Sequence, residues 1–84
     1  MKTLHIIRNM NDHFAKKIAG SGKKEKVAVL LIQDAVYEEM ESDRMTVYAC
    51  GDDCIARNVK NRYPVLSYQE IAKLVTEYDR TIVW

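Results

Sequence analysis

The stretch Val27-Ala28-Val29-Leu30-Leu31-Ile32 constrains the fold more than any other part of the sequence. All of its residues are apolar, without the alternation of a strand that has one face in water. Such a strand is buried on both faces, which is typical of a parallel sheet covered by helices. The sequence therefore predicts a buried parallel strand over residues 27–32.

Four other segments have strand character. Residues 3–8 and 81–84, near the two ends of the sequence, each contain apolar and β-branched side chains, and residues 45–49 are rich in β-branched and aromatic side chains. Residues 63–66 contain Pro64, which has no N–H group, so they form at best an edge strand.

Helices are expected between these strands. Asn11 or Asp12 is predicted to cap a first helix, which ends before Gly20, and residues 34–41 are predicted to form a short second helix capped by Asp34. Asp52 or Asp53 is predicted to cap a third helix. A fourth and last helix is the most clearly predicted. Ser67-Tyr68-Gln69-Glu70 has the pattern of a capping box, and an apolar face follows at helical spacing: Ile71, Leu74, Val75 and Tyr78.

The alternation of strands and helices predicts an α/β protein. We expect a three-layer α/β/α sandwich with a mostly parallel sheet of about five strands, and a single domain over residues 1–84. A chain this short buries a limited share of its surface, so homo-oligomerisation would help to stabilise it.

Composition argues against several functions. Thirteen basic and twelve acidic residues give a net charge of +1, so direct nucleic-acid binding is not indicated. Residues 27–32 are the longest apolar run and are too short to cross a bilayer. No secretory signal is seen, so we expect a cytoplasmic protein with reduced cysteines. No nucleotide-binding motif is present, and we expect no cofactor.

Cys50 is the strongest candidate for chemistry. It is predicted to lie just after the third strand and just before the third helix, at the edge of the sheet where ligands and reactive groups gather. The positive end of the helix dipole lowers the pKa of a thiol, whereas the adjacent Asp52 and Asp53 raise it. Sequence does not decide between these effects, or between a reactive thiol and a small buried hydrophobe.

Cys54 has three interpretations: core packing, a second redox thiol that could pair with Cys50, or a metal ligand. The metal interpretation lacks two further ligands with a recognisable spacing, and we expect no metal. His5 is interpreted as a buried or edge histidine with its hydrogen bonds satisfied, and His13 as a solvated residue or as a proton donor near Cys50.

Three stretches of the sequence resemble the DsrH/TusB family. The longest runs from Val47-Tyr48-Ala49 through Cys50-Gly51-Asp52-Asp53 to Ile55-Ala56-Arg57. The others are Leu30-Leu31-Ile32-Gln33-Asp34-Ala35-Val36 and Leu66-Ser67-Tyr68-Gln69-Glu70, and Trp84 as the final residue also fits. The match as a whole extends over nearly the whole chain, and these stretches occur in the family's order.

The resemblance implies a domain of the DsrE/DsrF/DsrH type, in a cytoplasmic complex that passes persulfide sulfur between protein cysteines. Such a relay serves 2-thiolation of wobble uridine in transfer RNA, or sulfur oxidation. The implied partners are DsrE/TusD-like and DsrF/TusC-like subunits, a TusA-like donor and a DsrC/TusE-like acceptor. We expect a sulfur-carrier or structural subunit rather than a stand-alone enzyme.

The resemblance also bears on Cys50. TusB-type subunits commonly have no cysteine at this loop, whereas the sulfur-carrying DsrE/TusD subunits do, and counting back from Arg57 places Cys50 at that carrier position. The sequence therefore predicts Cys50 as the persulfide carrier, with Cys54 as a candidate second thiol. The alternative is a non-catalytic assembly subunit in which Cys50 is incidental.

Overall fold

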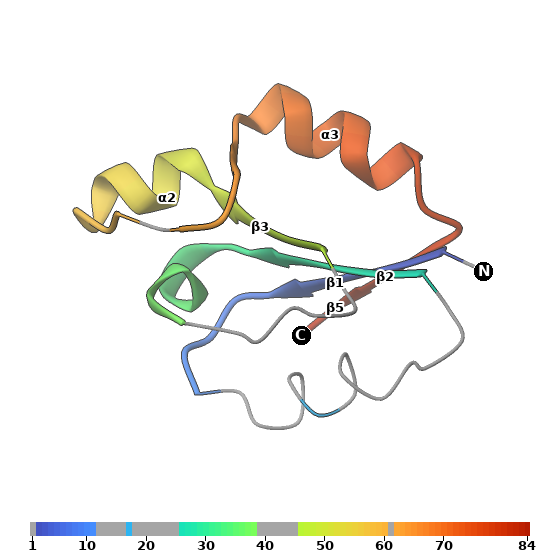
Figure 1. Ribbon diagram of the computed structural model, residues 1–84, viewed down its shortest axis with the longest axis horizontal. Coiled ribbons are helices and arrows are strands. Elements are labelled where there is room, and N and C mark those ends of the chain that lie inside the picture. The colour runs from blue at the N-terminus through green and yellow to red at the C-terminus, as the bar shows by residue number, and fades with distance from the viewer. Residues whose placement is uncertain (1, 12–16, 18–25, 39–45, 61) are drawn as a thin grey trace.

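The computed structural model describes residues 2–11, 17, 26–38, 46–60 and 62–84. Its centre is a five-stranded sheet in the order β4-β3-β2-β1-β5, and every strand pair is parallel (Figure 1). The strands are β1 (Lys2–Ile7), β2 (Lys26–Leu31), β3 (Thr46–Cys50), β4 (Val65–Leu66) and β5 (Arg80–Val83). The predicted mostly parallel sheet of about five strands is confirmed.

Strand β2 lies at the centre of the sheet, between β1 and β3. Its residues from Val27 to Leu31 are buried, and those from Ala28 to Leu31 have no exposed surface. This is the environment that the continuous apolar run predicts, because a central parallel strand meets covering elements on both of its faces.

Each face of the sheet has its own apolar cluster. The cluster on one face contains Leu4, Ala28 and Leu30, and Leu74 of helix α3 (Tyr68–Thr76) packs against them. The members of the other cluster come from strands, the short 3-10 helix η1 (Gln33–Tyr37), helix α2 (Gly51–Ala56) and the segment before β4: Ile7, Val29, Leu31, Ala35, Val36, Val47, Ala49, Cys54 and Tyr63. Figure 1 shows α3 along one face of the sheet and α2 beyond the carboxyl end of β3. The α/β architecture with elements packed on both faces is as predicted.

Helix α3 begins with the predicted capping box. Ser67 Oγ accepts a hydrogen bond from the Glu70 main-chain N–H at 3.2 Å, and Glu70 Oε1 accepts one from the Ser67 N–H at 3.0 Å. All four residues of the predicted apolar face, and Leu66 before the cap, belong to the cluster beneath α3. The predicted capping box and the predicted apolar face of this helix are both confirmed.

The second predicted helix is wrong in type and in its cap. The chain forms a short 3-10 helix, η1 (Gln33–Tyr37), whose N-cap is Ile32 and not Asp34. Gln33 has a φ of 51°, which turns the chain sharply at the end of β2. In this segment Val36 is buried, whereas Tyr37 is half exposed. The rest of the predicted helix, residues 39–41, lies outside the described residues.

The remaining predictions concern the ends and edges of the sheet. The segment that contains Pro64 forms only the two-residue edge strand β4, and the Pro64 carbonyl accepts a hydrogen bond from the Ala49 N–H at 3.0 Å. Strand β5 forms the opposite edge beside β1. The predicted first helix lies outside the described residues. Within the part of the chain that is described, no helix has the length and apolar character needed to cross a membrane.

Candidate functional site

Cys50 ends β3 and is the N-cap of α2. It lies opposite Leu66 in the β3–β4 pair. A Cβ atom at Gly51 would stand 3.3 Å from the Leu66 carbonyl oxygen, so glycine lets the β3–α2 junction approach the β4–α3 junction closely. Cys50 therefore lies at the carboxyl edge of the sheet, as predicted, and next to the segment from which α3 starts.

The predicted cap at Asp52 or Asp53 is wrong. Helix α2 begins at Gly51, directly after the strand, and both aspartates lie in its first turn. The Asp53 carboxylate is engaged elsewhere, because it accepts a hydrogen bond from the Gln33 N–H at 2.8 Å. The two carboxylates still lie at the positive end of the helix dipole, where negative charge is favourable.

The Cys50 thiol is buried, with 1% of the residue exposed. Burial is the largest cause that raises the pKa of this thiol above its ordinary value, and the Asp53 side chain raises it further as hydrogen-bond acceptor and as a negative charge. The main-chain N–H groups of Asp53 and Asp52 act in the opposite direction, although no side-chain hydrogen bond closes the cap. The net effect, led by burial, raises the pKa of the Cys50 thiol, which favours its protonated form.

Cys54 packs in the apolar cluster that contains Val47 and Ala49. The C-terminal end of α2 adds to this packing through a Schellman motif. Asn58 adopts a φ of 53°, its N–H bonds the Ile55 carbonyl, and the Val59 N–H bonds the Cys54 carbonyl at 2.9 Å. Val59 then packs against the same cluster. Contacts of this kind correspond to the core-packing interpretation of Cys54.

Both cysteines are free thiols. Burial, followed by the charge of Asp53, raises the pKa of Cys54 as well. On β3, Ala49 faces the cluster that holds Cys54. Cys50 is the next residue along the strand, so its side chain leaves the sheet on the face opposite to that of Ala49. Over the described ranges, no group of three or more His, Cys, Asp or Glu side chains is arranged to hold a metal ion.

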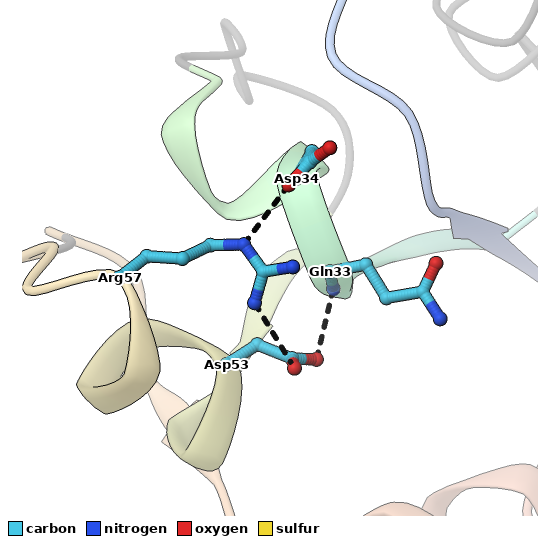
Figure 2. A network of polar contacts seen from close by, with 4 residues as sticks. All are labelled: Gln33, Asp34, Asp53 and Arg57. Atoms are coloured by element: carbon cyan, nitrogen blue, oxygen red, sulfur yellow. Dashed lines mark hydrogen bonds and ion pairs between the residues drawn. The ribbon is translucent and has the colours of Figure 1, made fainter.

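A network of polar contacts joins α2 to η1 beside this site (Figure 2). Asp53 Oδ2 accepts the hydrogen bond from Gln33, and Asp53 Oδ1 lies 3.4 Å from Arg57 Nη1. Arg57 Nε donates to Asp34 Oδ1 at 3.0 Å, and this bond is the main cause that raises the pKa of Arg57. The network holds the Asp53 carboxylate in place between the loop after β2 and the first turn of α2.

Sequence reasoning did not find this network. The spacing of Asp53 and Arg57 is the i,i+4 spacing of helical ion pairs, which was a readable signal. The contact between Arg57 and Asp34 joins two segments that are distant in sequence, so it depends on how β2 and β3 pair in the sheet. The structure brings the segments after β2 and β3 into contact at the carboxyl edge of the sheet.

Tyr68, the first residue of α3, is a second group beside Cys50 that sequence reasoning did not assign to the site. The charge of a Cys50 thiolate is the largest cause that raises the pKa of the Tyr68 phenol, followed by the charges of Asp53 and Asp52. Tyr68 is 62% exposed, whereas Cys50 is buried. The Cys50–Leu66 pairing explains this proximity, because Tyr68 follows Leu66 by two residues.

The two histidines differ in what the structure shows of them. His5 is buried, and its Nδ1 accepts a hydrogen bond from the Trp84 indole N–H at 3.1 Å, so its interpretation as a satisfied histidine is confirmed. His13, considered as a proton donor near Cys50, lies outside the described residues.

Comparison with known proteins supports the fold. No model of a known protein family matches the chain, and a search of curated proteins finds no match. Protein Tm0979 from Thermotoga maritima, solved in solution by NMR, is 29% identical, with 89% of this chain and 92% of that chain covered and a TM-score of 0.70. The ychN protein from E. coli is 13% identical over the full length of both chains, with a TM-score of 0.68.

The two similar structures and the all-parallel sheet can be compared with the family expected from the sequence. They support the DsrE/DsrF/DsrH-like fold, and they do not support the narrower assignment to DsrH/TusB. The chain has a DsrE/DsrF/DsrH-like α/β fold.

Proposed function

We propose that this chain is a subunit of an intracellular sulfur-relay complex and that Cys50 is its persulfide carrier. The observation that supports this most is the position of Cys50, at the carboxyl edge of a DsrE/DsrF/DsrH-like sheet and at the first turn of α2. Main-chain N–H groups of Asp52 and Asp53 act on its sulfur in the direction that favours a thiolate. A carrier sulfur needs such groups when it becomes an anion.

The proposed reaction is an exchange between thiols that needs no cofactor. The Cys50 thiolate attacks the outer sulfur of a donor persulfide, a new S–S bond forms at Cys50, and the donor leaves as a thiolate that takes up a proton. In the second step an acceptor thiolate attacks the outer sulfur on Cys50, which returns to a thiol. The sulfur that moves has the same oxidation state before and after each step.

The proposed partners are those of the resemblance: DsrE/TusD-like and DsrF/TusC-like subunits, a TusA-like donor and a DsrC/TusE-like acceptor, or further copies of this chain.

Two exposed apolar side chains lie near the site and would suit contact with a partner. Ile55 on α2 is 80% exposed and Val65 on the edge strand β4 is 53% exposed. They line an open hollow of about 490 Å³ with Gly51 and Cys54. The receiving pathway, either 2-thiolation of wobble uridine in transfer RNA or sulfur oxidation, is part of the same proposal.

A second candidate function is a non-catalytic assembly subunit of the same kind of complex. The observation that favours it is the state of the thiol, since Cys50 is buried and burial raises its pKa. Both properties slow attack on a persulfide.

Sulfur hand-over separates the two functions. The reduced protein is incubated with cysteine persulfide, freed of excess reagent, and mixed with a large excess of a small thiol, and the released sulfide is measured. A carrier releases about one sulfide per chain, Cys50→Ser releases none, and the matched variant Cys54→Ser releases as much as the parent. An assembly subunit releases no sulfide above the Cys50→Ser background.

A further inference from the structure

The sheet has two edges, and β5 forms the longer one. It lies beside β1 at the edge opposite to β4 (Figure 1), and no strand of the described part of the chain pairs with its outer side. Strand β4 has two residues and follows Pro64, which has no N–H group for pairing, whereas β5 has four residues, none of them proline or glycine. An open edge of this kind is a template for a further strand.

Two residues of β5 direct their main-chain groups away from the sheet. The Trp84 N–H donates to the Ile6 carbonyl at 2.9 Å, so the main chain of Trp84 faces β1. Because the main-chain groups of successive residues in a strand point to opposite sides, Ile82 also faces β1, and Thr81 and Val83 face outward. Val83 is 59% exposed. Thr81 and Val83 therefore present N–H and C=O groups to a neighbouring strand.

We propose that this edge binds a second copy of the chain, with β5 against β5 in antiparallel orientation about a two-fold axis at Ile82. Thr81 of each copy then lies opposite Val83 of the other. The two residues of each such pair both face outward, so each donates one main-chain hydrogen bond and accepts one. A two-fold axis uses the same edge twice, so the outward-facing groups of both copies meet partners.

The side chains of β5 are also complementary to a second β5. The pairing places Arg80, the charged residue of the strand, opposite Trp84 of the second copy, on the face of the sheet that holds His5. Side chains at such a position, between the hydrogen-bonded pairs, approach closely, and a guanidinium group over an indole ring is favourable. On the other face Val83 meets Thr81, and both are β-branched. The paired strands oppose no like charges.

A second copy suits this edge better than an unstructured peptide does. A second β5 is already held extended by its ladder with β1, so it loses little conformational entropy on pairing, whereas a free peptide must first be ordered. The edge is short, so we expect a dissociation constant in the high micromolar range and a monomer in dilute solution. Two strands separate β5 from β3, which carries Cys50, so the pairing is independent of sulfur transfer.

Protein concentration is the variable in the test. Sedimentation velocity of the reduced protein, from dilute to near-millimolar solution, measures the equilibrium between monomer and dimer. At the same concentrations, NMR measures how fast individual main-chain amide protons exchange with solvent. We expect a dimer at high concentration, with exchange slowed several-fold at Thr81 and Val83. Exchange at Ile82, whose N–H faces β1 in each copy, should change little.

Lysine substitutions locate the interface. Val83→Lys places a charge on the outer edge of β5 and should weaken the dimer about ten-fold or more. The matched control is Val65→Lys, the same change at a position that is 53% exposed on the opposite edge, and it should leave the dimer unchanged. Circular dichroism in dilute solution checks that each variant is folded.

Three results would overturn the proposal. The chain could stay monomeric at every concentration, or a dimer could survive Val83→Lys or be weakened equally by Val65→Lys. The Thr81 and Val83 amides could also exchange slowly in dilute solution already, which would mean that the chain covers its own edge. Persulfide loading of Cys50 plays no part in these measurements, so this proposal and the sulfur-carrier role fail separately.

Discussion

The indole Nε1 of Trp84 donates a hydrogen bond to Nδ1 of His5 at 3.1 Å, and the two rings stack with centroids 6.1 Å apart. The bond ties the residue after β5 to the middle of β1, and the Trp84 main-chain N–H donates to Ile6 at 2.9 Å beside it. Because Nδ1 of His5 is an acceptor, His5 is neutral with its remaining proton on Nε2. The edge strand β5 is thus joined to the sheet by a side-chain contact as well as by its ladder.

Replacing Trp84 by Phe should destabilise the protein. The change keeps an aromatic ring but leaves the buried Nδ1 of His5 without its donor, which costs about 1–3 kcal/mol. Urea unfolding followed by circular dichroism measures the loss. The control is Val83→Ala at an exposed position of β5, where we expect a change within about 0.5 kcal/mol. Equal stabilities of Trp84→Phe and the parent would show that the bond contributes nothing.

Stability should depend on pH through His5. Burial, and then the charge of Arg80, lower the pKa of His5 in the folded protein below its ordinary value of 6.5. The unfolded chain therefore binds the proton first as pH falls, so the free energy of unfolding decreases from about pH 6.5 downward until the folded-state pKa is passed. Unfolding curves across this range should show the decrease in the parent and a smaller one in His5→Gln. The same slope in both proteins would exclude His5 as its source.

The fold could be predicted from sequence where local patterns agree with burial. The burial of β2 and the start of α3 are each indicated by a few neighbouring residues, the apolar run and the capping box, and both predictions were confirmed. The segment after β2 was predicted wrongly, because its end is set by contacts that are distant in sequence. The Ala35 N–H bonds the main-chain oxygens of Arg8 and Ile32, which favours a tight 3-10 turn over a longer helix.

Ser67→Ala should weaken the start of α3. The substitution removes the oxygen that accepts the Glu70 N–H, and loss of such a cap costs about 1 kcal/mol. Chemical denaturation gives the change in the free energy of unfolding. Gln69→Ala, at an exposed position of the same turn, is the matched control and should change stability much less. A loss in both variants of the same size would point to the helix as a whole and not to its cap.

Gly51→Val should destabilise the β3–α2 junction. A Cβ atom added at this position would stand 3.3 Å from the Leu66 carbonyl oxygen and 3.9 Å from Val65 Cβ. The two methyl groups of valine would therefore require β4 to move. Overpacking of this kind costs about 1–3 kcal/mol. Thermal unfolding compares Gly51→Val with Gly51→Ala, for which a smaller change is expected. If Gly51→Val and Gly51→Ala unfold at the same temperature, the edge strand β4 moves aside without a measurable cost in stability.

The candidate site was only partly readable from sequence. The place of Cys50 after a strand and before a helix followed from local pattern, and the structure shows it there. Whether the helix dipole or the acidic neighbours control the thiol was left open, because the answer depends on burial and on where the Asp53 carboxylate points. The approach of Tyr68 depends on the pairing of β3 with β4 and has no local signal.

The central claim is that Cys50 carries sulfur, and persulfide loading tests it most directly. The reduced protein is incubated with cysteine persulfide, alkylated and digested, and fragment masses locate any extra sulfur, with Cys50→Ser and Cys54→Ser analysed alongside. We predict one added sulfur on Cys50 that persists in Cys54→Ser and disappears in Cys50→Ser. No added sulfur, or equal amounts on both cysteines, would contradict a carrier role and leave the chain as an assembly subunit.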